Sequence, residues 1–150
     1  MLAAKITEMF NLTKIRNLQE NEIERRVVTL RKIYVTLAVL GIIVLLIKWR
    51  EFFSEDITKI GQIFFHFIVY ASIYFGLKNK RNWIIMFILF VSALGFLLGC
   101  LYVFSPANTL AELAEKISGI FFLLFYGYQL IFFSGQNVRT YYGVKGRIIF

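Results

Sequence analysis

Proline and the side chains that most often bind metals or form disulfides are scarce in this sequence. Proline, cysteine and histidine each occur once among 150 residues. A single Cys100 excludes an intrachain disulfide, and a single histidine cannot supply the clustered ligands of a metal site. The chain also lacks an H-E-x-x-H motif, a phosphate-binding glycine loop and any carboxylate within its apolar core segments. The sequence therefore predicts a protein that is not an enzyme and that holds no metal or cofactor.

Apolar residues, by contrast, are too abundant for a soluble fold of this length. They make up 59% of the chain, which contains 17 phenylalanines and has a mean hydropathy of +0.68. The apolar residues fall into long continuous runs, which favours membrane helices over the short alternating strands of a β-barrel. We therefore predict an all-α, polytopic membrane protein with four transmembrane helices and a cytoplasmic N-terminal helical extension. The predicted membrane domain is 33–134, with spans at about 33–48, 57–77, 83–104 and 110–133.

Two helix boundaries are marked by specific residues. Ser105-Pro106 should end the third helix, because proline cannot continue the hydrogen-bond ladder and restricts the residue before it. Thr109-Leu110-Ala111-Glu112 has the pattern of a capping box and should begin the fourth helix. Ser54, Glu55 and Asp56 are in turn expected to cap the second helix.

The distribution of Lys and Arg predicts the orientation of the chain. Thirteen of the 17 lie in the two tails and the second loop, and four lie on the opposite side. This bias places both termini in the cytoplasm and the protein in a cytoplasmic (inner) membrane. We expect the basic residues beside the spans to contact lipid headgroups rather than nucleic acid: Arg25, Arg26, Arg31, Lys32, Lys78, Lys80 and Arg81.

The cytoplasmic N-terminal segment is predicted to be partly helical. Residues 1–32 contain a short amphipathic stretch, Ala3–Phe10, and a charged stretch, Asn17–Lys32, expected to continue into the first span as one helix. The segment either lies on the membrane surface or docks a cytoplasmic protein partner or a second copy. No cleavable signal is expected, and 135–150 is predicted to be a cytoplasmic tail.

A polar stripe on the second span is the leading candidate for a functional site. Lys59, Gln62, His66, Tyr70 and Tyr74 recur at helical spacing and should share one face. One interpretation is a pore or translocation pathway, in which His66 could change charge near neutral pH. The other is hydrogen bonding between helices, for which Gln129 of the fourth span is a candidate partner.

Small residues indicate where helices could approach closely. The third span contains the GxxxG pair Gly95 and Gly99, and the second span contains Ser72 and Gly76 at the same spacing. Gly119 and Gly127 lie in the fourth span. Such residues allow close helix packing, either within one chain or between subunits. The sequence leaves both possibilities open.

Three functional hypotheses follow from these features. The leading one is a non-enzymatic, self-associating small membrane protein that forms a pore or anchors a soluble partner as a scaffold. Its partners would be the lipid bilayer, copies of itself forming a homo-oligomer, and a cytoplasmic protein bound through residues 1–32. A bacterial stress or anti-phage defence system is one conceivable setting, without a motif to support it. The alternatives are a small secondary transporter or exporter, and an intramembrane enzyme using Ser72 or Ser92 with His66.

Overall fold

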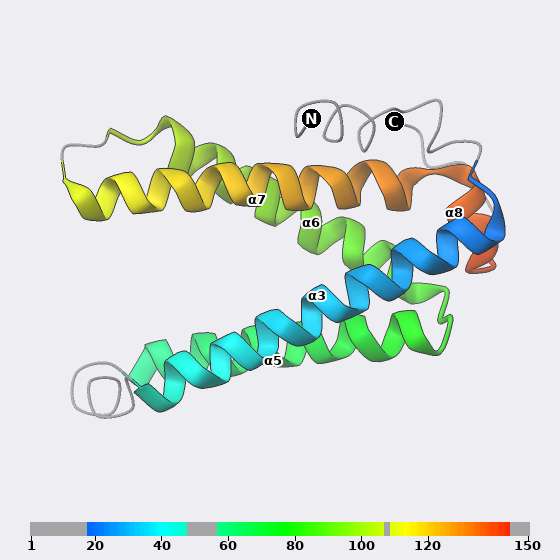
Figure 1. Cartoon of the computed structure of the whole chain (residues 1–150), viewed down its shortest axis with the longest axis horizontal. Helices are drawn as coiled ribbons and strands as arrows, with labels where there is room; N and C mark the ends of the chain where they lie inside the picture. Colours follow the sequence, from blue (N-terminus) through cyan, green and yellow to red (C-terminus); the bar gives the residue numbers. More distant parts are fainter. Residues whose placement is uncertain (1–17, 48–56, 107–108, 145–150) are drawn as a thin grey trace. The chain divides into compact units, whose positions relative to one another are not determined.

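The computed structural model describes residues 18–47, 57–106 and 109–144, and within these ranges all regular secondary structure is α-helical. The described residues form four long helices and one short one, which are labelled in Figure 1. Their bounds are α3 Glu20–Ile47, α5 Ile57–Lys78, α6 Trp83–Phe104, α7 Leu110–Ser134 and α8 Gln136–Tyr141. The all-α prediction is therefore confirmed for the described residues.

The chain divides into two compact units. One unit comprises Asn21–Ile84 and so contains most of α3 together with α5. The other comprises Met1–Glu20 and Ile85–Phe150 and contains most of α6 together with α7 and α8. We call them the α3–α5 unit and the α6–α7 unit and describe each separately.

In the α3–α5 unit, two helices pack against each other in antiparallel fashion (Figure 1). The Tyr34 and Tyr70 ring centroids are 5.6 Å apart, while Arg31 contacts Tyr74 one turn further along α5. Residues increase along α3 as their partners decrease along α5, which defines the antiparallel direction. The helix α3 also confirms that the charged stretch before residue 33 continues into the apolar stretch as one helix.

In the α6–α7 unit, the two long helices are likewise antiparallel. Ser92 contacts Gln129, Gly95 faces Tyr126, and Gly99 faces Gly119 and Leu123. The short helix α8 follows α7 after Gly135, within a segment that the sequence predicted only as a tail. The Asn137 side-chain amide donates a 3.2 Å hydrogen bond to the Leu18 carbonyl oxygen, which joins α8 to the residues just before α3.

Helix ends follow the local chemistry of the sequence. The Thr109 hydroxyl accepts a hydrogen bond from the Glu112 amide at 3.2 Å, and the Glu112 carboxylate accepts one from the Thr109 amide at 2.9 Å. This confirms the predicted capping box at the start of α7. The helix α6 ends at Phe104, directly before Ser105-Pro106, as predicted.

The end of α5 carries a turn that the sequence did not indicate. The Lys80 amide donates to the Leu77 carbonyl and the Arg81 amide donates to the Gly76 carbonyl, which is the Schellman pattern. Lys80 occupies the left-handed position of this turn with φ 47°, where glycine is the usual residue. Lysine is tolerated there because the two backbone hydrogen bonds satisfy carbonyls at the helix end.

Two of the described helices are long and apolar enough to cross a membrane. These are Trp83–Phe104 and Glu112–Ser134. The segment Phe64–Lys78 of α5 is apolar but shorter, and α3 has charged residues along its first half. The first and second of the four predicted spans therefore remain predictions. The amphipathic stretch Ala3–Phe10 and the capping residues Ser54, Glu55 and Asp56 lie outside the described residues.

Candidate functional site

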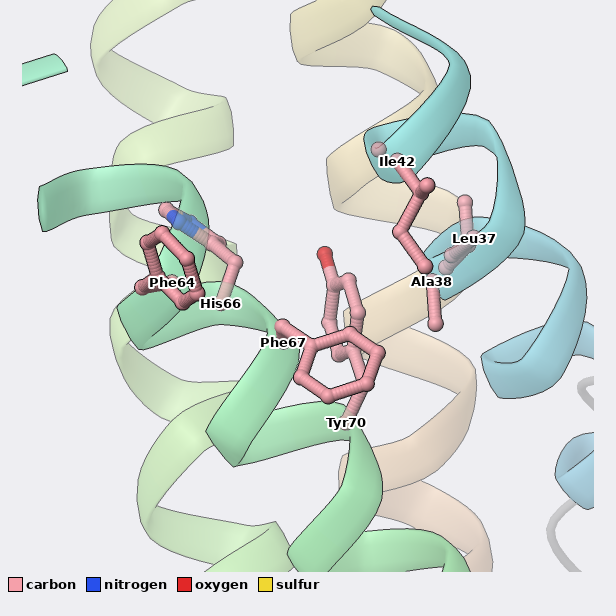
Figure 2. A pocket seen from close by; sticks show the side chains of 8 residues that line it. Leu37, Ala38, Ile42, Phe64, His66, Phe67 and Tyr70 are labelled. Carbon is pink, nitrogen blue, oxygen red and sulfur yellow. The ribbon is translucent and has the colours of Figure 1, made fainter. Parts of the chain in front are cut away.

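An apolar pocket of about 340 Å³ lies between the two helices of the α3–α5 unit. Its α3 wall includes Ala38, Gly41 and Ile42, and its α5 wall includes His66 and Tyr70. A side chain at residue 41 would fill part of this space, because a Cβ built on Gly41 meets no atom within 4 Å. In Figure 2 the Tyr70 ring stands between the helices, with its hydroxyl oxygen as a polar group in apolar surroundings.

The predicted polar stripe is only partly shown by the structure. His66 is exposed, and its ring lies 6.1 Å from the Tyr70 ring between centroids. Tyr70 and Tyr74 are half-buried and both face α3. The side chains of Lys59 and Gln62 lie outside the described part of the chain. Three members of the stripe are thus placed along the α3–α5 unit, and two of them contact the neighbouring helix.

Arg31 and Tyr74 form a polar contact that sequence reasoning did not anticipate. The Arg31 guanidinium carbon lies 4.9 Å from the centre of the Tyr74 ring, and its Nη2 donates to the Tyr74 hydroxyl at 3.4 Å. Stacking of a guanidinium on an aromatic face is favourable, and more so when water is partly excluded. In the sequence, Arg31 stands out as a basic residue beside the first span and Tyr74 as a member of the polar stripe. Neither pattern predicts that the two side chains contact each other.

The other basic residues near the predicted interface gather at the same end of the α3–α5 unit. Arg25 and Lys32 are exposed on the first half of α3, while Arg26 is half-buried there. Lys78, Lys80 and Arg81 are exposed at the end of α5. The helices α3 and α5 are antiparallel, and Arg31 contacts Tyr74. The start of α3 and the end of α5 therefore lie at the same end of the unit. Glu22 and Glu24 of α3 lie at this end too, and the basic residues outnumber them, so the end is net basic.

A buried polar pair lies in the α6–α7 unit. The Ser92 hydroxyl donates to the Gln129 side-chain oxygen at 3.1 Å, and both residues have 0% exposure. The structure thus places Gln129 against α6. Ser92 uses its hydroxyl hydrogen in this bond, so the described geometry gives no support to Ser92 as a nucleophile activated by His66.

Four glycines of α6 and α7 lie where these two helices contact each other, and Gly99 and Gly119 face each other directly. A Cβ at Gly99 would lie 3.0 Å from the Gly119 carbonyl oxygen and 3.0 Å from the Leu123 amide nitrogen. A Cβ at Gly95 would overlap the Tyr126 ring, and one at Gly127 would touch Phe96 at 3.4 Å. We call these four glycines the glycine seam: Gly95, Gly99, Gly119 and Gly127. The seam permits close approach of the two backbones.

Ser72 and Gly76 of α5 do not belong to the glycine seam. Gly76 is buried, and a Cβ there would lie 2.6 Å from Ile84 side-chain atoms in the first turn of α6. Ser72 is half-buried one turn earlier on α5 and lines an open groove described below. Gly76 therefore allows the chain to turn back tightly after α5.

The described residues contain no group of three or more His, Cys, Asp and Glu side chains that could hold a metal ion. Their chemistry consists of aromatic, amide and hydroxyl groups between helices, together with one exposed imidazole and a basic end. Comparison of the chain with protein-family models, curated proteins and solved structures gave no match.

Proposed function

We propose that this chain is a non-enzymatic, four-pass protein of the cytoplasmic membrane that associates with copies of itself. Large apolar side chains are exposed on each of the long helices, including Leu46 at 67%, Phe65 at 64%, Leu97 at 60% and Ile117 at 62%. A water-soluble surface carries such residues singly, whereas a lipid-facing surface carries them throughout. This pattern supports membrane embedding beyond the two helices that qualify by length and apolar composition.

The basic end of the α3–α5 unit supports the proposed orientation. If both helices cross the membrane, the first half of α3 and the turn after α5 emerge on the same side. Those two regions hold Arg25, Arg26, Lys32, Lys78 and Arg81, and the cytoplasmic side is where basic residues accumulate. The packing of α3 against α5 and the charge count therefore agree on one topology.

Self-association is supported chiefly by the exposed His66. Its neighbours on α5 are apolar and strongly exposed, with Phe64 at 56%, Phe65 at 64% and Ile68 at 60%. An imidazole in contact with lipid is costly, and such groups usually face protein or a water-filled cavity. A second copy packed on this face, or a pore formed by several copies, would give the exposed side of the ring a protein or water environment. The exposed Phe65 ring lies 6.1 Å from the His66 ring between centroids, and we call the surface formed by these two residues the His66 face.

Cysteine cross-linking in native membranes tests the His66 face. In a variant with Cys100 replaced by alanine, Phe65→Cys should give a disulfide-linked dimer on mild oxidation. Leu97→Cys on α6, with 60% exposure against 64% for Phe65, is the matched control and should give little dimer. Equal cross-linking at both positions, or a monomer in native mass spectrometry of the detergent-solubilised protein, would count against self-association through α5.

Ion flux into proteoliposomes separates the two forms of this proposal. A pore lined by His66 predicts a conductance that His66→Ala changes in size. A scaffold that anchors a soluble partner predicts no conductance above that of protein-free vesicles for either protein. The cross-linking result is expected in both cases, so it tests association independently of transport.

A further inference from the structure

A second hollow of the α3–α5 unit lies on the outer surface of α5 and has one polar end. It is an open groove of about 550 Å³. Its lining includes the small residues Ala71, Ser72 and Gly76 and the large, exposed rings of Phe67 and Phe75. Asn79, Arg81 and Trp83 close one end, where α5 turns into α6. Small residues beside large exposed rings explain why the surface is hollow here.

The dimensions of the groove match one leaflet of a bilayer. From Phe67 to Lys78, the last residue of α5, the helix rises by about 17 Å. Half of a typical hydrocarbon core is about 15 Å thick. An extended acyl chain lying in the groove would therefore reach from the polar end to near the middle of the membrane.

The charge at the polar end fits an anionic headgroup. Arg81 is exposed and lies beside the exposed Lys78 and Lys80, and the segment 78–82 contains no acidic residue. A guanidinium can bind a phosphate through two parallel hydrogen bonds, and the Asn79 amide can donate a further one. Trp83 is half-exposed, at 51%, at the level where indole rings favour the membrane interface.

We propose that this groove binds one anionic phospholipid, with its phosphate at Arg81 and Asn79 and an acyl chain along Ile68, Ala71 and Ser72. The proposal rests on the membrane embedding and orientation proposed above, but it does not require self-association. The cytoplasmic leaflet, on which the 78–82 turn is predicted to lie, is the leaflet in which basic segments meet anionic lipid. A second copy is a poorer occupant, because its own Lys78 and Arg81 would bring like charge to the same end.

Native mass spectrometry of the full chain in detergent tests the proposal directly. Phosphatidylglycerol and phosphatidylcholine are titrated separately, and the bound fraction is read from the mass of each adduct. The wild-type chain should bind phosphatidylglycerol more tightly than phosphatidylcholine. Arg81→Gln should weaken phosphatidylglycerol binding by about fivefold or more, since one basic residue contributes about 1 kcal/mol to such contacts. Lys116→Gln, on α7, is the charge-matched control and should leave it unchanged.

A groove-filling variant tests the acyl-chain part of the site. Ser72→Leu keeps every charge but occupies part of the groove, so it should weaken binding of both lipids. Ala93→Leu, at an exposed position of α6, is the matched control. The proposal is wrong if the Arg81→Gln and Ser72→Leu variants both bind lipid as tightly as the wild-type chain. The same spectra report the oligomeric state, so a monomer with intact, Arg81-dependent binding would refute self-association and leave the lipid site standing.

Discussion

Single glycines set the distance between α6 and α7. At Gly99 the space for a Cβ is limited by backbone atoms of α7 on two sides, at 3.0 Å each. Backbone atoms cannot rotate away as a side chain can, so a methyl group must push the helices apart. The Ser92–Gln129 hydrogen bond lies on the same interface and depends on the same spacing.

Replacing Gly99 by alanine should therefore destabilise the protein. We expect a loss of about 1–3 kcal/mol, the range typical of overpacking in a closely packed interface. Gly41→Ala is the matched control, because residue 41 is also within a helix and a Cβ there meets nothing within 4 Å. It should be neutral or stabilise by up to about 1 kcal/mol through helix propensity. Thermal unfolding in detergent, followed by tryptophan fluorescence, measures both; equal melting temperatures would argue against the glycine seam.

Residue-level contacts between distant segments were the hardest features to predict. The spacing of polar residues predicts the stripe on α5. It does not predict which helix each of these residues faces, because that depends on how the helices pack. Tyr74 pairs with Arg31 and Gln129 pairs with Ser92, and neither pair follows from sequence separation. Polar residues in apolar helices could be recognised as candidates, whereas their partners required the three-dimensional arrangement.

At the scale of whole helices, boundaries were predicted well wherever local chemistry determines them. The capping box at Thr109 and the stop before Pro106 involve only residues within one turn. The continuity of α3 from Glu20 to Ile47 likewise follows from the lack of proline in this stretch, where a single glycine, Gly41, is not enough to end the helix. The helix α8 was missed because six residues after a glycine carry little periodic signal.

The capping box predicts a local change at the start of α7. Thr109→Ala removes the hydroxyl that accepts from the Glu112 amide, so the first turn should fray. Hydrogen exchange at the Glu112 amide should accelerate by about fivefold, corresponding to a cap of about 1 kcal/mol. Thr109→Ser should retain slow exchange. Thr36→Ala is the control, because its hydroxyl bonds only to the Lys32 carbonyl within α3; acceleration there as well would indicate a general loss of structure.

At the scale of the whole molecule, the proposed topology makes a prediction about access to each side of the membrane. With Cys100 replaced by alanine, single cysteines at Lys5 and Glu55 should react differently with a membrane-impermeant thiol reagent. The Glu55 position should be labelled from outside in intact cells, and the Lys5 position only after the cells are opened. Labelling of the Lys5 position alone in intact cells would reverse the orientation, and labelling of both positions from outside would contradict the single span predicted between them.

The arrangement of apolar character along the chain also has a consequence for synthesis. Ribosomes make α3 and α5 before α6, yet α6 and α7 are the described helices with enough length and apolar character to qualify as spans. If the chain enters the membrane as proposed, the less apolar helices leave the ribosome first, and the contacts of Arg31 with Tyr74 and of Tyr34 with Tyr70 can hold them together until α6 is made. Insertion under the proposed topology should accordingly be sensitive to how fast translation reaches residue 104, where the most apolar described helix is complete.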